Sequence, residues 1–369
     1  MKATDRLNRL VHPWMVKYVM RAYDKKSKRV EAQHPELFKP VDPSLSARHR
    51  ALWSRTGLKS GDRWLRLHVN LTGIQDYAFC PEDIFFARIE RVLNDCNNAG
   101  YGPEEKNDLH HYVPEECEPE TLVRYVRGNF FDGDMNWLSD GRVRDLLAAE
   151  QDGVVGKPCR SSGGNGVEVR TDLTPAWIRS NGGESYVVQR KIRQCAFAAA
   201  FNKSSVNTIR MMTLRRPWDG EIVVCRSMMR MGVSDVVIDN MMKGGLCVCV
   251  GKDGRLGRFA YDYDGMRFER HPVSGLTFEG LAHPGYAQMV ATAKMIHGRI
   301  GAYNLLSFDF VQRDDGSICV VEINATSEGI TQLQYDFGGL FGENSEQLVD
   351  WCAEHVAFDS FAHLRTFYA

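Results

Sequence analysis

Two stretches decide the fold class of this chain: Ser307-Phe308-Asp309-Phe310-Val311 and, a few residues later, Cys319-Val320-Val321-Glu322-Ile323-Asn324. Both runs alternate polar with apolar residues as half-buried strands do, and the Asp315-Gly316 pair between them is a strong hairpin signal. If that pair forms a two-residue turn, Asp309 lies directly opposite Glu322 and Ser307 directly opposite Asn324. All four side chains then share one face of an antiparallel hairpin.

Two carboxylates that face each other across a strand pair repel. A divalent cation between them resolves the repulsion, and Asp, Glu and an Asn carbonyl are hard oxygen ligands. We therefore predict that Asp309, Glu322 and Asn324 bind Mg²⁺ or Mn²⁺. The alternative is a solvated acidic face on an edge hairpin.

A second motif is a lysine-bearing strand, Val154–Arg160, that runs into the loop Ser161-Ser162-Gly163-Gly164-Asn165-Gly166. Consecutive glycines let backbone N–H groups wrap an anion, and Lys157 supplies a cation beside them. The lysine precedes the glycines, so this is not the common Gly-x-x-x-x-Gly-Lys phosphate loop. The alternative is a flexible hairpin with a solvated lysine.

Two further strands carry polar residues. Ser185–Ile192 ends in polar residues whose backbone could bind an adenine edge, and on its own this signal is weak. Arg210 enters an apolar β-run, where a guanidinium needs an anionic partner. Arg226 and Arg230 lie on the returning strand. A two-residue Asp219-Gly220 turn puts both on the face of the sheet opposite to that of Arg210, and a longer loop would reverse this, so the convergence of the three arginines stays open. The alternative is a partly exposed strand whose arginines are solvated.

In their order along the chain, these motifs resemble the ATP-grasp superfamily. That order is the lysine-bearing strand, the Ser/Gly loop, the strand that ends in Gln-Arg-Lys-Ile, and the late hairpin with Asp309 and Glu322-Ile323-Asn324. The segments Asn207–Arg210, Asp239-Asn240, Gly244-Gly245 and Glu322–Ser327 more narrowly resemble its sugar-transfer-associated group. The resemblance implies an α/β (α+β) fold, in which two α/β lobes clamp ATP, preceded by a small N-terminal α/β domain and a basic N-terminal helix.

The resemblance also implies roles for individual residues. Asp309, Glu322 and Asn324 hold Mg²⁺ (or Mn²⁺), and the catalytic residues Arg210 and Arg230 neutralise the transferring phosphoryl group. The ATP-binding residues are Lys106, Lys157, Ser161, Ser162, Gly163, Gly164, and the adenine-contacting residues Gln189, Arg190, Lys191 and Ile192. Of these, Lys106 matches by position only, and its alternative is a solvated loop lysine.

The implied activity is ATP-dependent ligation of a carboxylate to an amine. An acyl phosphate forms, ADP and phosphate leave, and an amide or peptide bond results, on amino-acid or sugar-acid substrates of a biosynthetic pathway. One alternative is a kinase-like transfer of phosphate to a hydroxyl group. Another is a non-catalytic, nucleotide-binding assembly factor.

The chain has 369 residues, 43% of them apolar, which is long enough for several packed units. We divide it into a helical extension (1–50), a small α/β domain (51–105), a first ATP-grasp lobe (106–192) and a second lobe with C-terminal helices (193–369). A net charge of −1 argues against a nucleic-acid partner. Small-molecule substrates are expected, and a homodimer is an open option.

No apolar run is long enough to span a membrane, and ten cysteines without a Cys-x-x-Cys pair indicate reduced thiols in a cytoplasmic protein. Residues 1–50 hold 12 Lys/Arg against 5 Asp/Glu. Apolar residues recur there at helical spacing, and Pro13 is expected to kink or restart that helix. The helix either docks its apolar stripe on the body or touches an anionic membrane surface.

Overall fold

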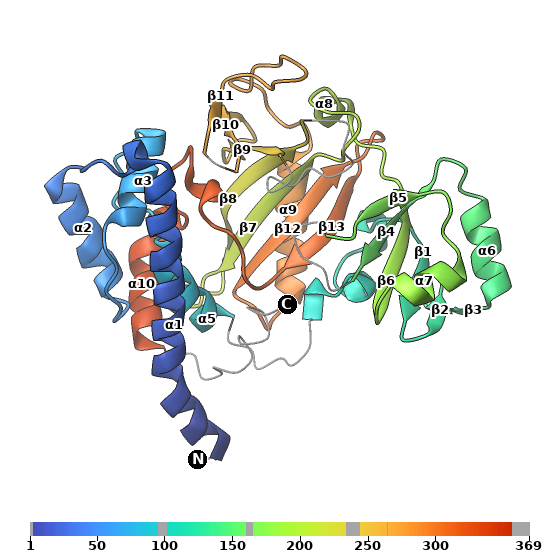
Figure 1. Cartoon of the computed structure of the whole chain (residues 1–369), viewed down its shortest axis with the longest axis horizontal. Helices are drawn as coiled ribbons and strands as arrows, with labels where there is room; N and C mark the ends of the chain where they lie inside the picture. The colour runs from blue at the N-terminus through green and yellow to red at the C-terminus, as the bar shows by residue number, and fades with distance from the viewer. Residues whose placement is uncertain (1–2, 95–101, 160–164, 234–243, 264, 356–369) are drawn as a thin grey trace.

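The computed structural model of the chain describes residues 3–94, 102–159, 165–233, 244–263 and 265–355, with side chains of the first helix from residue 12 onward. It consists of a group of N-terminal helices, a six-stranded sheet and a seven-stranded sheet (Figure 1). Both sheets are antiparallel throughout, and the predicted mixed α/β class is confirmed. No helix among the described residues is long and apolar enough to cross a membrane.

The helical part gathers both ends of the described chain, and Figure 1 shows α10, in red, packed among the blue N-terminal helices. Its elements are α1 (Ala3–Gln33), η1 (Pro35–Phe38), α2 (Pro43–Ser54), α3 (Arg63–Thr72), α4 (Glu82–Ile84), the π-helical turn η2 (Phe85–Ile89), α5 (Glu90–Leu93) and α10 (Ser345–Glu354).

Capping residues set several of these boundaries. The Asp42 carboxylate accepts the N–H of Ser44 at 2.7 Å and so starts α2. Gly73 ends α3 in the left-handed region, at φ 79°. The predicted restart of the first helix at Pro13 is wrong, because α1 continues through it. A proline removes one backbone donor, and the buried contacts of Met15 and Val19 outweigh that loss.

The sequence predicts a small α/β unit over residues 51–105, and its strands are a wrong prediction. The described residues of this range form α-, π- and 3₁₀-helices only. Between Ile84 and Leu93 nearly every residue is buried. Residues 84–93 are helical as expected, and the predicted strands rest on short apolar runs elsewhere in this range, which periodicity alone does not assign to strand or helix.

The six-stranded sheet carries the lysine-bearing strand. Its strand order is β3-β2-β1-β6-β4-β5, and α6 (Asp140–Ala148) and α7 (Pro175–Asn181) pack into its core through Val143 and Ile178. The strands are β1 (Thr121–Val126), β2 (Asn129–Phe131), β3 (Trp137–Leu138), β4 (Val154–Pro158), β5 (Glu168–Arg170) and β6 (Ser185–Arg190).

The seven-stranded sheet has the order β11-β10-β9-β8-β7-β12-β13. Its strands are β7 (Thr208–Arg215), β8 (Ile222–Met231), β9 (Leu246–Val250), β10 (Leu256–Tyr261), β11 (Arg267–Phe268), β12 (Leu305–Gln312) and β13 (Ile318–Asn324). Shorter elements are α8 (Ala196–Ala199), η3 (Gly102–Glu104), η4 (Lys106–His111), η5 (Glu115–Cys117), η7 (Gln332–Gln334) and η8 (Gly342–Asn344).

This sheet is covered on both faces. Met211 packs into one core with α9 (Tyr286–Arg299), whereas Met212 packs into the other core with the N-terminal helices. The strand β12, which lies between β7 and the edge strand β13, is therefore buried from Leu305 to Val311. Asp309 shares the parity of Leu305, which places it on the face that the N-terminal helices cover.

The predicted pairing of the β12–β13 hairpin is confirmed, with Asp309 opposite Glu322 and Ser307 opposite Asn324. The predicted turn is wrong. Arg313 pairs with Ser317 around a three-residue loop that ends at Gly316, at φ 86°. This loop shifts the register by one residue, and a bulge between Asp309 and Phe310 shifts it back.

Candidate functional site

Asp309 lies at the centre of a buried charge cluster on three neighbouring strands. Its carboxylate accepts Nε and Nη2 of Arg210 on β7, both at 2.8 Å, and Nη2 of Arg230 on β8 at 2.8 Å. Burial would raise the pKa of this carboxyl, but the two guanidinium groups outweigh burial and lower that pKa to about 2. The bidentate contact fixes the Arg210 side chain.

The convergence of the arginines, left open by the sequence, is decided by a bulge in the β7–β8 pairing. The four-residue loop keeps the parity of a two-residue turn, and the bulge between Met212 and Thr213 shifts the register by one residue, which places Arg230 opposite Thr208, on the face of Arg210. Arg230 also donates to the Thr208 hydroxyl. Arg226 shares this face, but its guanidinium donates to the carbonyl of Phe337 at 2.8 Å. Two arginines therefore meet at Asp309.

Lys106 and Lys157 bring two buried ammonium groups to Glu322. Lys106 Nζ lies 2.9 Å from Glu322 Oε1, and only 9% of its side chain is exposed. The alternative of a solvated loop lysine is therefore wrong for Lys106. Lys157 is 7% exposed, and burial followed by repulsion from Lys106 lowers its pKa to about 8. No ion pair to Lys157 is found among the described residues.

The buried ammonium group of Lys157 is costly without an anionic partner. Glu322 is the carboxylate that Lys106 contacts and the one whose field acts on Lys157. Burying an ammonium group without a counter-charge destabilises the folded state by several kcal/mol, at an order of magnitude. The arrangement therefore suits a polyanionic ligand that enters beside the two lysines.

The oxygen ligands predicted for a metal ion fit Mg²⁺ in chemistry. Glu322 contacts Lys106 through one oxygen. The Asn324 amide nitrogen is buried without a hydrogen bond to any described residue, and as a donor it suits an anionic oxygen rather than a metal ion. Asp309 instead uses its oxygens for three arginine contacts. Among the described residues, no group of three or more His, Cys, Asp or Glu side chains is arranged for a metal ion.

The predicted Ser/Gly loop residues Ser161, Ser162, Gly163 and Gly164 lie outside the described residues, as does Asp239-Asn240. The strands that flank the loop are described. Residues 154–156 of β4 pair with residues 168–170 of β5, so a hairpin carries Lys157 towards the loop.

The predicted adenine segment lies where the chain leaves the six-stranded sheet. The Gln189 amide donates to the Thr121 hydroxyl at 3.1 Å, and its buried oxygen has no hydrogen bond among the described residues. Arg190 forms ion pairs with Glu120 and Glu150, and Lys191 Nζ donates to a backbone carbonyl. Ile192 is half-buried. Arg190 and Lys191 therefore form their polar contacts at the surface, away from the Asp309 cluster.

The residues that hold the loop after Asn324 were not predicted from the sequence. The Glu104 carboxylate accepts the N–H groups of Ala325 and Thr326, both at 2.8 Å. Asn94 donates to the Ala325 carbonyl at 2.6 Å. Glu90, whose pKa burial raises to about 8, accepts the N–H of Glu328 at 3.2 Å. Glu90 and Asn94 come from α5 and its C-terminal end, Glu104 comes from η3, and no local pattern marks these residues.

Glu328 extends the charge cluster beyond Asp309. Its carboxylate lies 3.6 Å from Nη1 of Arg210, and burial raises its pKa. The preceding residue, Ser327, has a φ of 58°, which is uncommon for a residue other than glycine. Backbone strain of this kind is typical of functional loops whose surroundings hold them in place, as Glu90 and Glu104 do here.

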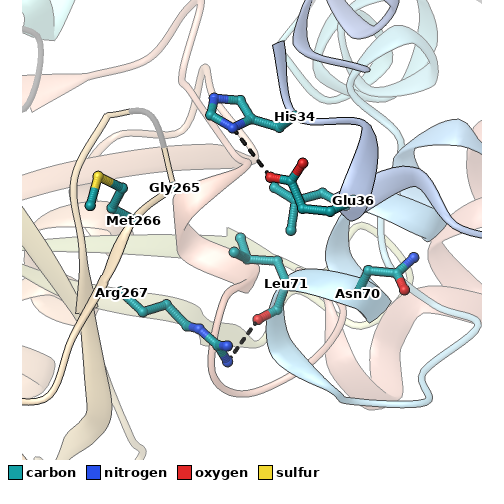
Figure 2. Close-up of a pocket in the computed structure, with 8 residues that line it drawn as sticks. His34, Glu36, Asn70, Leu71, Gly265, Met266 and Arg267 are labelled. Atoms are coloured by element: carbon teal, nitrogen blue, oxygen red, sulfur yellow. Dashed lines mark hydrogen bonds and ion pairs between the residues drawn. The ribbon is translucent and has the colours of Figure 1, made fainter. Parts of the chain in front are cut away.

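A separate pocket of about 170 Å³ lies between η1, α3 and the β10–β11 hairpin (Figure 2). Arg267 donates to the Leu71 carbonyl there, and His34 lies 3.5 Å from Glu36. None of the predicted site residues lines this pocket.

Comparison with known proteins shows which sequences and structures this chain resembles. The sequence model of the family described as "Sugar-transfer associated ATP-grasp" matches residues 139–346. No curated protein matches the chain.

Among solved structures, an ADP complex of N5-carboxyaminoimidazole ribonucleotide synthetase has a TM-score of 0.40 at 11% identity, covering 65% of this chain and 50% of that one. An L-amino acid ligase from Bacillus licheniformis has a TM-score of 0.38 at 11% identity, over 69% and 47%. D-alanyl-alanine synthetase A from Vibrio cholerae has a TM-score of 0.41 at 10% identity, over 68% and 64%. The chain spans about half the length of the first two enzymes.

Proposed function

Because this chain belongs to the sugar-transfer-associated ATP-grasp family, we propose that it is an ATP-dependent ligase that joins a small-molecule carboxylate to an amine. The reaction passes through an acyl phosphate and releases ADP and phosphate. ATP and Mg²⁺, or Mn²⁺, are the proposed cofactors.

The observation that carries the proposal is the buried ammonium group of Lys157, beside that of Lys106. Lys157 has no ion pair among the described residues, and Lys106 contacts Glu322 at 2.9 Å. The triphosphate of ATP is a polyanion that supplies the missing negative charge. The Asn324 amide, buried without a hydrogen bond, lies two residues from Glu322 on the same strand.

Each cationic side chain has a role in the proposed reaction. Lys106 and Lys157 bind ATP phosphate oxygens and hold them in line with the attacking carboxylate. Arg210, fixed by Asp309, and Arg230 stabilise the negative charge of the transferring phosphoryl group. A metal ion held by Glu322 and Asn324 would neutralise phosphate charge.

The chemistry needs no nucleophile from the protein. A substrate carboxylate oxygen attacks the γ-phosphorus of ATP, and the bond from that phosphorus to ADP breaks. The amine then attacks the acyl carbon, phosphate leaves with the bonding electron pair, and the amine loses a proton.

Hydroxylamine provides the direct test, because it intercepts an acyl phosphate as a stable hydroxamate. The protein is incubated with Mg²⁺-ATP, pooled carboxylic acids and hydroxylamine, and ADP, phosphate and hydroxamate are measured together. We expect hydroxamate in equal amount to ADP. The Lys157→Met variant should abolish the signal, whereas the matched variant Lys252→Met, at a lysine that is 79% exposed, should keep it.

Two outcomes contradict the proposal. A phosphorylated product with ADP and no hydroxamate would show the kinase-like alternative. Nucleotide binding without any turnover across the carboxylate pools would favour the non-catalytic alternative.

A further inference from the structure

The outer face of α1 is not used by the proposed reaction. Between residues 12 and 33, exposed cations and aromatic rings recur on one side of this helix. At 3.6 residues per turn they lie within about 60° on either side of Trp14. They are Trp14, Lys17, Tyr18, Arg21, Lys25, Lys28 and Arg29, and we call them the basic face of α1.

The opposite side of α1 is anchored to the body of the protein. Met15 and Val19 are buried, and Tyr23 stacks on Phe86 with the ring centroids 4.5 Å apart. Trp14 is 72% exposed and Tyr18 is 49% exposed. The division between the two sides means that the basic face is presented in a fixed orientation.

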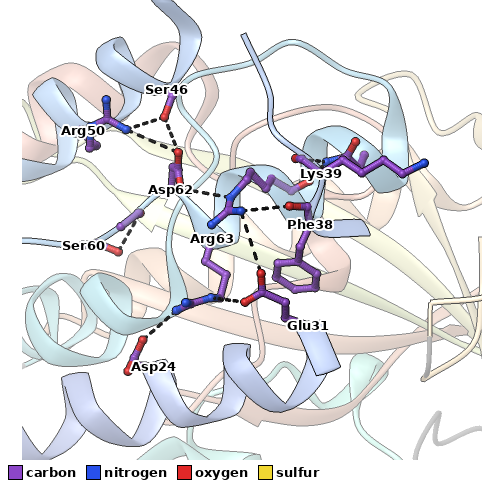
Figure 3. Close-up of polar contacts among 12 residues, drawn as sticks. Asp24, Glu31, Phe38, Lys39, Ser46, Arg50, Ser60, Asp62 and Arg63 are labelled. Atoms are coloured by element: carbon purple, nitrogen blue, oxygen red, sulfur yellow. Dashed lines mark hydrogen bonds and ion pairs between the residues drawn. The ribbon is translucent and has the colours of Figure 1, made fainter. Parts of the chain in front are cut away.

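The acidic residues of this helix are neutralised from the inner side. Arg63 of α3 donates to Glu31 at 2.7 Å and to Asp24 at 2.8 Å (Figure 3), and Lys28 also contacts Asp24. These are the two acidic residues between positions 12 and 33. The basic face therefore keeps a net positive charge.

Four cations of that face are available to a partner. Lys17, Arg21, Lys25 and Arg29 form no ion pair with the residues that the structure describes. Figure 1 shows the N-terminal end of α1 extending past the neighbouring helices, so a broad surface can reach it.

We propose that the basic face of α1 docks on a membrane that contains anionic lipids. Lysine and arginine are attracted to anionic headgroups, and tryptophan and tyrosine favour the interface between headgroups and acyl chains. A nucleic acid or an acidic protein would use the cations, but it gives no comparable reason for the exposed Trp14 and Tyr18 rings on the basic face. The proposal is independent of the ligase reaction.

Flotation of the full chain with vesicles tests this inference. One set contains phosphatidylcholine alone and the other contains 30% phosphatidylserine, a composition chosen for the assay. We expect binding to the anionic set only, weakening as salt rises because exposed charges are screened. The Lys17→Gln/Arg21→Gln/Lys25→Gln variant should bind about 100-fold more weakly, since each basic residue contributes a factor of about 5.

The matched control is Lys203→Gln/Lys252→Gln/Lys294→Gln, which removes three exposed lysines outside α1 and should bind as the wild type does. Adding Trp14→Ala to the Lys17→Gln/Arg21→Gln/Lys25→Gln variant should weaken its binding to anionic vesicles further. Both triple variants should keep the nucleotide-dependent reaction, because none of these residues contacts the Asp309 cluster. A failed ligase test would therefore leave this result unaffected.

Three outcomes would overturn the proposal: no flotation with anionic vesicles, equal binding to both vesicle sets, or equal weakening of binding by the two triple variants. Retention on an immobilised nucleic acid or acidic protein that depends on Lys17, Arg21 and Lys25, without flotation, would overturn it in favour of that partner class.

Discussion

Replacing Lys157 with methionine should stabilise the folded protein while it removes nucleotide binding. Methionine has a similar shape and no charge, so the variant deletes the buried ammonium group without leaving a large cavity. In the wild type, burial and the neighbouring Lys106 lower the pKa of Lys157 from 10.5 to about 8. A group with a lower pKa in the folded state binds protons more weakly there than in the unfolded chain.

The pKa shift sets both the size and the pH range of the effect. A shift of this size corresponds to about 3 kcal/mol, at 1.36 kcal/mol per pH unit. Below pH 8 the full cost of the buried charge is present. Between pH 8 and 10.5 the unfolded chain holds the proton and the folded protein releases it, so the free energy of unfolding of the wild type rises.

Urea unfolding of both proteins at pH 7 and at pH 10.5 measures this difference. Lys157→Met should be more stable than the wild type by up to about 3 kcal/mol at pH 7, and the difference should shrink towards zero at pH 10.5. The control Lys252→Met, at an exposed lysine, should show no such pH-dependent gain. A variant that is less stable than the wild type at pH 7, or a difference that does not change with pH, would refute the argument.

Three further predictions concern the neighbouring residues. Glu322→Gln should lower Mg²⁺-dependent turnover at least 10-fold with the fold retained, and wild-type turnover would remove the metal assignment; steady-state rates across a Mg²⁺ titration measure this. Glu104→Gln should destabilise the protein by about 2 kcal/mol, because two N–H groups lose a charged acceptor, and urea unfolding checks the loss. Mg²⁺ and ATP together should raise the melting temperature more than either alone; equal shifts from ATP with and without the metal ion would contradict a shared site.

Several features of the site could be predicted because they depend on residues close together in the chain. The pairing of Asp309 with Glu322 follows from strand alternation across a short connection. It is observed although the predicted turn is wrong, because a bulge restores the register that the three-residue loop shifts. Arg210 in an apolar strand indicates that an anionic partner exists, since a buried guanidinium needs one.

The identity of that partner could not be predicted. Repulsion between Asp309 and Glu322 was expected to require a metal ion, whereas the structure places Arg210 and Arg230 on Asp309 and Lys106 on Glu322. The two arginines converge because a bulge between Met212 and Thr213 shifts the β7–β8 register by one residue, whereas the four-residue loop alone would keep the parity of a two-residue turn. A one-residue shift in register decides which face a strand residue occupies.

The sequence by itself determined the pairing of the β12–β13 hairpin and the family to which the chain belongs. These depend on local periodicity, turn residues and short motifs. Only the tertiary structure decided that Lys157 is buried beside Lys106 and that Glu104 holds the backbone at Ala325, 221 residues away. Burial and long-range hydrogen bonds are properties of the packed chain, and they set the charge and the pKa of each group at the site.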